Sequence, residues 1–378
     1  MTTLAEFQST FEVEPGYFNW ARFGPLSSTV RDEAVHMLDQ LASGREASSR
    51  FIEAAGQDAR TQVAKLLGCP DHEVTLQPST SHGLQQTIYG ITGGIVASAL
   101  DFPSITVPIV RAARSAKVTP QWIDRGFRFV TPEAVADALT DETSALAVSL
   151  VDFRTGYRAD LAALREVIGD DRLLIVDATQ AFGVVDVDWS LADVVAGHAY
   201  KWLRAGRGTA FARFGHRARV GIDPVLSGVT GTADADAYEE VPAPDASARA
   251  FTVAPCDPLA AVRLTAAVTQ VRDVGIDVID EALVAQTQRV IDLADEHGID
   301  VLTPRDPARR AGIVALAPAA SRVGTLGAVL ANDGISATVR SGLVRIAPHV
   351  GTSDESFEML GRSFAVFAQS APPAHSGS

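Results

Sequence analysis

Hydrophobic residues recur at helical spacing near the start of the chain. Between Ser28 and Leu67 they return every three or four positions, as in "VRDEAVHMLDQL", a period typical of an amphipathic helix. Gly68 follows directly, and glycine is the residue that most often ends a helix. We therefore expect the region from residue 28 to residue 67 to be helical.

Beyond this region, short apolar runs alternate with helical stretches. Runs such as "SALAVSLV" and "RLLIVDA" are almost continuously apolar, which is typical of strands buried on both faces of a parallel sheet. Their alternation with helices indicates an α/β fold, with a mostly parallel sheet covered on both faces. The expected strands are residues 73–77, 95–99, 117–124, 144–151, 172–178 and 192–199, and the expected helices are residues 79–91, 101–116, 131–140 and 160–168.

The pattern loosens after residue 214. Residues 215–250 are rich in Gly, Asp, Ala and Pro and are expected to form a long irregular loop, a feature that is usually functional. Helices then follow from residue 258 and from residue 279, and two short strands enclose another helix. We expect four parts: an N-terminal segment 1–25, a large domain 26–259, a smaller C-terminal α/β domain 260–370 and a disordered tail 371–378.

Composition narrows the classes of partner. The chain has 378 residues and a net charge of −14, which argues against a nucleic-acid partner because phosphate backbones require a basic surface. Its apolar runs are shorter than the ~20 residues that span a bilayer, and its N-terminus lacks a signal-peptide pattern. We therefore expect no membrane contact and a cytoplasmic location. Cys69 and Cys256 are expected to be reduced thiols, and no CxxC pair suggests a metal site.

One lysine lies in an unusual setting. Lys201 stands between Tyr200 and Trp202 in "GHAYKWLRAGRGTAF", just after an expected strand, and Asp177 ends the expected strand before it. Ligands of open parallel sheets bind outside the carboxyl ends of the strands, so both side chains are expected at one edge. They could form an ordinary salt bridge. Alternatively, the lysine could form a Schiff base with pyridoxal phosphate, while the carboxylate keeps the pyridine nitrogen of the cofactor protonated.

A phosphate cradle is also present. "PSTSHG", residues 78–83, places hydroxyl side chains where a turn opens a helix, and helix N-termini bind phosphate. Ser and Thr are equally the commonest helix caps, so the stretch is weak by itself. A dinucleotide-binding dehydrogenase is disfavoured because no GxGxxG follows the first strand.

The segment "LIVDATQAFGVVDVDWSLADVVAGHAYKWLRAGRGTAFARF" resembles the core of class V aminotransferases. These are fold-type I pyridoxal phosphate enzymes, and they include cysteine desulfurases and kynureninases. The resemblance implies a large domain with a mostly parallel sheet, a smaller C-terminal domain, pyridoxal 5'-phosphate as cofactor and a small amino-acid substrate. It further implies a homodimer with its sites at the subunit interface.

The resemblance also implies roles for individual residues. Lys201 would be the Schiff-base lysine, Asp177 would pair with the pyridine nitrogen, and Gln180 would hydrogen-bond the ring hydroxyl. Arg345, in "LVRIAPHVGTSDE", would hold the substrate α-carboxylate, which a planar guanidinium can grip with two hydrogen bonds. Phe102 of "DFPS" would stack on the pyridine ring. The implied phosphate-binding residues are Thr80, Ser81, His198 and Tyr200.

Other readings of these residues stay open at this point. Phe102 could belong to the core, His198 could be an ordinary buried histidine, and Arg345 could form a surface ion pair. Three further residues could line the substrate pocket or be ordinary loop residues: Asn19, Arg22 and Arg340.

Two departures from the family bear on the reaction. Cysteine desulfurases carry a mobile cysteine shortly before the carboxylate-binding arginine, and "ISATVRSGLVRIAP" has none. Kynureninases carry a Gly-Trp step where this chain has Val229, and the family's Gly-Thr-Pro segment appears here as "VAPCDP". An aminotransferase is therefore the preferred expectation. A kynureninase-like hydrolase, a β-lyase or an epimerase is the alternative, and the intact lysine and aspartate disfavour a non-catalytic homologue.

Overall fold

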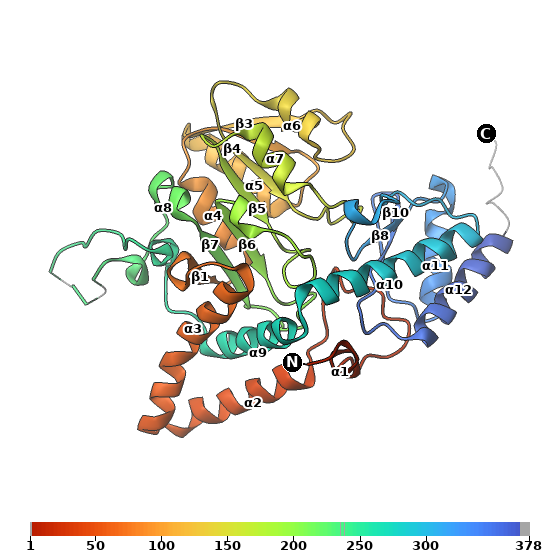
Figure 1. The fold of residues 1–378 in the computed structure, drawn as a ribbon, viewed down its shortest axis with the longest axis horizontal. Helices are drawn as coiled ribbons and strands as arrows, with labels where there is room; N and C mark the ends of the chain where they lie inside the picture. Colours follow the sequence, from red (N-terminus) through yellow and green to blue (C-terminus); the bar gives the residue numbers. More distant parts are fainter. Residues whose placement is uncertain (1, 235, 238, 371–378) are drawn as a thin grey trace.

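A computed structural model of the protein describes residues 2–234, 236–237 and 239–370 (Figure 1). The expected tail 371–378 lies outside the described residues. The chain begins with α1 (Leu4–Ser9), which was not expected, and continues with α2 (Ser28–Ser43) and α3 (Glu46–Leu67). Both long helices end on a glycine in the left-handed conformation, Gly44 and Gly68, so the expected helical region is confirmed.

The centre of the molecule is a seven-stranded sheet of order β1-β7-β6-β5-β4-β2-β3. Only β7 runs antiparallel to its neighbours, so the sheet is mostly parallel as expected. The reason is the connection before β7: the chain returns from β6 through residues 199–209 without a crossover helix, and a parallel return needs one. The strands are β1 (Val74–Gln77), β2 (Gly93–Ser98), β3 (Val118–Ile123), β4 (Thr143–Ser149), β5 (Leu173–Asp177), β6 (Val194–His198) and β7 (Ala210–Phe214).

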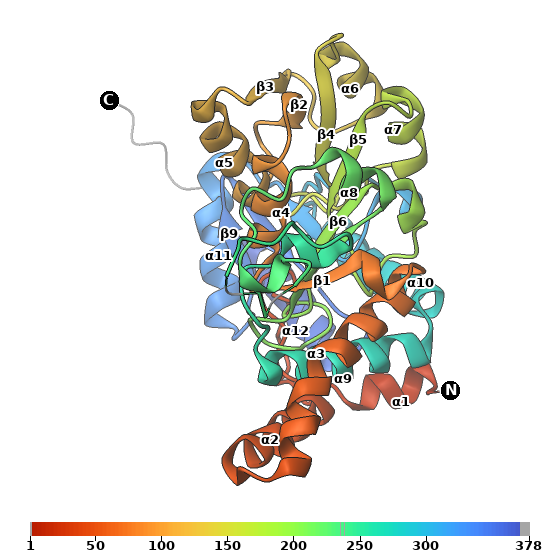
Figure 2. The same cartoon turned by 90° about the vertical axis from the view of Figure 1, so that its left-hand side faces the viewer.

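Helices cover both faces of this sheet (Figures 1 and 2). Alternate residues of a strand enter different cores: Ile95 of β2 belongs to the cluster that includes residues of α4 and α5, whereas Val96 belongs to the cluster that includes residues of α6, α7 and α9. Both faces are therefore apolar, which explains the continuous apolar runs in the sequence. The covering helices are α4 (Thr80–Tyr89), α5 (Pro103–Ala112), α6 (Pro132–Ala138), α7 (Leu161–Ile168) and α9 (Pro258–Val274).

The C-terminal part forms a second, three-stranded antiparallel sheet of order β8-β10-β9. The N-terminal segment joins it, because Tyr17 bridges to Ser336 and Asn19 bridges to Ala347. The expected domain boundaries stay predictions. Two elements here, β9 and α12, were not expected. The elements are α10 (Ile276–Glu296), β8 (Val314–Leu316), α11 (Val323–Asn332), β9 (Thr338–Arg340), β10 (Leu343–Ile346) and α12 (Asp354–Gln369).

The stretch 215–250 is less irregular than its composition indicated. It contains α8 (His216–Gly221) and ends in the short 3-10 helix Ala248–Phe251. Phe251 stacks on Phe214 of β7 with ring centroids 3.8 Å apart, so this end of the loop is part of the core. Within the described ranges, no helix is long and apolar enough to cross a membrane.

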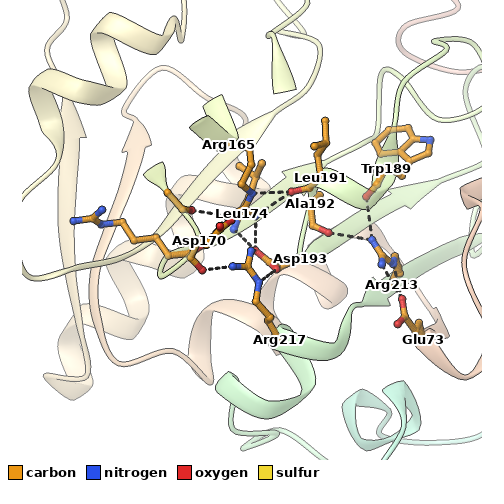
Figure 3. Close-up of polar contacts among 12 residues, drawn as sticks. Glu73, Arg165, Asp170, Leu174, Trp189, Leu191, Ala192, Asp193, Arg213 and Arg217 are labelled. Carbon is orange, nitrogen blue, oxygen red and sulfur yellow. Dashed lines mark hydrogen bonds and ion pairs between the residues drawn. The ribbon is translucent and has the colours of Figure 1, made fainter. Parts of the chain in front are cut away.

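A buried ion-pair network lies at the amino end of β5 and β6 (Figure 3). The carboxylate of Asp193, just before β6, accepts hydrogen bonds from Arg165 of α7, from Arg217 of α8 and from the backbone N–H of Leu174 in β5. One aspartate thus ties two helices and a strand together. The network is at the end of the sheet opposite to Asp177 and Lys201, so it bears on stability.

Candidate active site

Lys201 and Asp177 lie at the same edge of the sheet. Asp177 is the last residue of β5, and Lys201 follows the end of β6, which runs parallel beside it. Both side chains are buried, with 6% and 3% of their surface exposed. They line one small pocket together with Phe102, Ser149, Val151, Phe153, Thr179 and Gln180.

The electrostatic setting of Lys201 favours its neutral form. Burial lowers the pKa of the amine to about 7, and Arg345 and Arg207 act in the same direction, while Asp177 opposes them. In the described part of the chain no carboxylate oxygen lies within 4.0 Å of the lysine nitrogen, so the ordinary salt bridge weighed above is not formed. An amine that is half neutral near pH 7 is a competent nucleophile and base.

The lysine loop is held by the N-terminal segment. The backbone N–H of Gly24 donates to the carbonyl of Tyr200 at 2.9 Å. A Cβ on Gly24 would lie 1.9 Å from the carbonyl oxygen of Lys201, so only glycine permits this close approach. The loop turns at Arg204, which has a φ of 59° and whose guanidinium lies 3.8 Å from the ring centroid of Phe11.

Among the described residues, one carboxylate oxygen of Asp177 accepts a hydrogen bond and the other accepts none. Its Oδ1 accepts a hydrogen bond from the backbone N–H of Thr179 at 2.8 Å. Burial raises the pKa of the carboxyl group, and the hydrogen bonds with Thr179 and the charge of Lys201 oppose the rise. A buried carboxylate of this kind is stabilised by a cationic partner.

Gln180 is held by two hydrogen bonds that the sequence did not indicate. Its Nε2 donates to the carbonyl of Ala21 at 3.0 Å, and its Oε1 accepts from the indole N–H of Trp202 at 2.9 Å. The two bonds fix the orientation of the amide, and one amide hydrogen is left to donate into the pocket.

Two of the expected phosphate-binding residues, Thr80 and Ser81, lie in the first turn of α4. Ser79 caps this helix by accepting from the N–H of His82, a role that the sequence motif left open. Thr80 Oγ1 lies 3.1 Å from Oγ1 of Thr179, and Ser81 Oγ lies 2.7 Å from Oγ of Ser104. Both hydroxyls therefore already have partners at the helix N-terminus.

His198 and Tyr200 stack face to face, with ring centroids 3.7 Å apart. The Nδ1 atom of His198 is buried and has no hydrogen-bond partner among the described residues. Burial lowers the pKa of His198 well below its usual value, so the ring is neutral at pH 7. A buried, unpartnered nitrogen is costly unless a ligand supplies the missing hydrogen bond.

Phe102 starts α5 and meets Phe153 edge to face, with ring centroids 5.1 Å apart. Asp101, which the sequence analysis did not single out, fixes this corner. Its carboxylate accepts from the backbone N–H of Phe102 at 2.6 Å and from the hydroxyl and N–H of Ser149 at 2.6 and 3.0 Å. Burial raises the pKa of Asp101 to about 6. The only sequence signal was its place before "FPS".

Arg345 lies beside this pocket and does not line it. One guanidinium nitrogen donates to the carbonyl of Phe153 at 2.7 Å, and Nε is buried without a partner in the part of the chain that the structure describes. Burial lowers the pKa of Arg345 to about 10, and the nearby Arg340 and Arg22 add to the effect. The surface ion pair weighed for Arg345 is not formed with any described residue.

Comparison with known proteins places this geometry in a family. The family model for class V aminotransferases matches residues 29–369. The chain is similar to an uncharacterised aminotransferase, YcbU, of Bacillus subtilis, at 26% identity over 88% of this chain and 87% of YcbU. It is also similar to kynureninase of Deinococcus radiodurans, at 27% identity over 75% of this chain and 71% of the relative.

Solved structures show the same fold. A cysteine desulfurase of Thermococcus onnurineus NA1 superposes with a TM-score of 0.84 at 18% identity, covering 97% of this chain and 98% of the other. A lysine-to-alanine mutant of C-DES, with glycine covalently linked to its PLP cofactor, gives 0.86 at 17% identity, covering 96% and 99%. The expected fold type is confirmed, and the match over residues 29–369 shows that the chain belongs to the class V aminotransferase family, which works with pyridoxal phosphate.

Proposed function

We propose that the protein is a pyridoxal phosphate-dependent enzyme that acts on an amino acid, most simply as an aminotransferase, with Lys201 as the residue that binds the cofactor covalently. One observation carries the proposal: a buried lysine with a pKa of about 7 shares a pocket with a buried aspartate. The cofactor supplies an electron sink for the negative charge that develops at the substrate α-carbon.

The residues present fit this cofactor. The free oxygen of Asp177 suits a protonated pyridine nitrogen, whose positive charge offsets the cost of burying the carboxylate. The remaining amide hydrogen of Gln180 suits the ring oxygen. The unpartnered Nδ1 of His198 suits a phosphate oxygen, as do the free N–H groups at the N-terminus of α4. Phe102 provides an aromatic face at the pocket wall.

Lys201 has a second task once its amine is free. In its neutral form the amine of Lys201 would accept the proton from the substrate α-carbon and then donate it to a carbon of the cofactor. One group would thus serve as general base and then as general acid. Arg345 holds the α-carboxylate and so orients the bond that is broken. The aromatic rings of Phe102 and Phe153 restrict the access of water to this position.

A carbon–sulfur or carbon–carbon lyase is the second candidate, because solved relatives include the cystine C-S lyase C-DES and curated relatives include kynureninases. Transfer of sulfur to an enzyme thiol is disfavoured. Cys69 follows α3 and Cys256 precedes α9, and neither lines the pocket. Burial also raises the pKa of the Cys69 thiol to about 11, which makes it a poor nucleophile. The proposed assembly is a homodimer.

The chain offers a clean test because it contains only three lysines, Lys65, Lys117 and Lys201. Incubation with pyridoxal phosphate should give a yellow protein, and borohydride should fix the chromophore on Lys201. Peptide mapping should find the label on this residue alone. Lys201→Ala should abolish the label, whereas Lys65→Ala and Lys117→Ala, at two exposed positions, should retain it. A wild type that takes up no cofactor overturns the proposal.

The reaction can be resolved with L-alanine and 3-chloro-L-alanine. A transaminase converts L-alanine to pyruvate in one stoichiometric half-reaction and leaves the cofactor in its amine form. A β-lyase releases pyruvate, chloride and ammonia from 3-chloro-L-alanine over many turnovers and keeps the cofactor in its aldehyde form. If the protein turns over 3-chloro-L-alanine many times but does not convert L-alanine to pyruvate, it is a β-lyase and not an aminotransferase.

A further inference from the structure

Three arginines gather beside the proposed substrate position. Arg345 lies on β10 and Arg340 ends β9, the neighbouring strand. Arg22 belongs to the N-terminal segment, whose Asn19 bridges to Ala347, directly after β10. The Oγ1 atom of Thr338, which faces Arg345 across the two strands, donates to the side-chain oxygen of Asn19 at 2.8 Å. Two distant segments of the chain thus place Arg22 and Arg340 close enough to Arg345 for their charges to lower its pKa.

No acidic side chain neutralises this cluster. Within the described ranges, Arg22, Arg340 and Arg345 have no carboxylate oxygen within 4.0 Å. The nearest acid in sequence to Phe153 is already used, because Asp152 pairs with Arg154 at 2.6 Å. The chain has 46 acidic and 32 basic residues. Because acidic residues are in excess, three neighbouring arginines without an acidic partner are unexpected.

The cluster adjoins the pocket of Lys201. The guanidinium of Arg345 donates to the carbonyl of Phe153, and that of Arg340 lies 5.9 Å from the ring centroid of the same phenylalanine. Phe153 itself lines the pocket. A molecule that extends from Lys201 past Phe153 therefore meets these positive charges.

One α-carboxylate does not need three guanidinium groups, since a single arginine can grip it with two hydrogen bonds. We propose that Arg22 and Arg340 form a subsite for a second negative charge, so that the substrate is an amino acid with an anionic side chain. This rests on the proposed function, in which Arg345 takes the α-carboxylate. An anion at the subsite relieves the mutual repulsion of the arginines, which otherwise remains because nothing in the described chain offsets it.

The probes are diacids and their monoamides, which have nearly the same shape and differ by one charge. Succinate, glutarate and adipate would be titrated into the holoenzyme by calorimetry, each against succinamate, glutaramate or adipamate. We expect at least one diacid to bind roughly 10–100-fold tighter than its monoamide, as for hydrogen bonds to a charged group. The preference should decrease from low to high potassium chloride because screening weakens charge contacts.

Variants assign this preference to the cluster. Arg340→Gln and Arg22→Gln alter two exposed side chains. Each should reduce the diacid affinity by a larger factor than the monoamide affinity, so that the ratio of the two falls towards one. Arg31→Gln, on exposed α2, removes the same charge elsewhere and should keep the full preference.

Two results overturn the proposal. In the first, no diacid binds more tightly than its monoamide, as expected if an acidic side chain of a second copy of the chain covers the cluster. In the second, the preference for the diacid is unchanged in both Arg22→Gln and Arg340→Gln. Failure of the proposed function is detected separately, because it removes the borohydride label on Lys201. The same titrations are therefore also run on the protein without cofactor, where a preference for a diacid tests the arginine cluster by itself.

Discussion

The indole N–H of Trp202 donates a 2.9 Å hydrogen bond to the side-chain oxygen of Gln180. The carbonyl of Trp202 is itself 2.8 Å from Nε2 of the buried His349. The residue next to Lys201 therefore connects the cofactor pocket with the C-terminal part of the chain. The hydrogen bond from Trp202 orients the amide of Gln180, whose remaining N–H can donate into the pocket.

Replacement of Trp202 by phenylalanine should remove this constraint. The buried oxygen of Gln180 then lacks a partner, which costs about 1–3 kcal/mol, and the absorbance maximum of the bound cofactor should shift. Trp20→Phe is the matched control, because the indole N–H of Trp20 is buried without a partner among the described residues. Urea unfolding of both variants measures the difference. Equal losses of stability would show that only ring size matters.

Asp101→Asn should weaken cofactor binding although Asp101 does not line the pocket. The carboxylate accepts three hydrogen bonds that hold Phe102 against the end of β4, and an amide presents its NH₂ group to one of these donors. We expect the dissociation constant of pyridoxal phosphate to rise roughly tenfold, measured by absorbance titration. Asp124→Asn provides the control, because Asp124 makes a similar turn contact with Gly126 on an exposed loop, and it should leave the constant unchanged.

Asp193→Ala should destabilise the protein without altering the cofactor spectrum. It leaves Arg165 and Arg217 without their shared carboxylate in the network of Figure 3, and removing one partner of a buried ion pair costs about 3–5 kcal/mol. Asp295→Ala breaks the pair with Arg305, in which both side chains are 51% exposed. Thermal unfolding of both variants should show a much smaller loss for Asp295→Ala. Comparable losses would contradict a special role for Asp193.

The sequence predicts the elements that have a regular spacing of apolar residues along the chain. Continuous apolar runs between helices identify a covered parallel sheet, and the position of Asp177 and Lys201 after successive strands puts both at one edge. The joining of Asn19 to β10 could not be predicted, because it pairs residues more than 300 positions apart. The short β9 carries no period long enough to detect.

The candidate site also has a part that the sequence predicts and a part that it does not. Lys201 and Gln180 lie in one continuous motif, so a resemblance can identify them. The partners that fix their geometry come from elsewhere: Ala21 and Gly24 from the N-terminal segment, and Asp101 from the loop before α5. For the arginine cluster, the resemblance proposes Arg345 for the α-carboxylate, and the sequence leaves Arg22 and Arg340 as either pocket or loop residues. Only the folded chain brings the charges of Arg22 and Arg340 near Arg345.

The last prediction concerns the protonation of Lys201 in the protein without cofactor. Burial lowers the pKa of this amine from 10.5 to about 7, with Asp177 opposing and Arg345 and Arg207 contributing. Between these two values the unfolded chain binds a proton that the folded chain does not, so the free energy of unfolding rises with pH across that window. Below pH 7 both states are protonated, and the cost of burying the charge is fully present.

Lys201→Met removes this cost. The variant should therefore exceed the wild type in stability most strongly below about pH 7, and its advantage should fade as the pH approaches 10.5. Urea unfolding at several pH values measures the trend. Reductive ¹³C-methylation adds a direct titration: only three lysines are present, and Lys201→Ala identifies the signal. A stability advantage that does not change with pH, or a Lys201 signal that titrates near 10.5, would mean that the folded protein buries no uncharged amine. Lys201 would then need another residue to take its proton before it could attack an aldehyde.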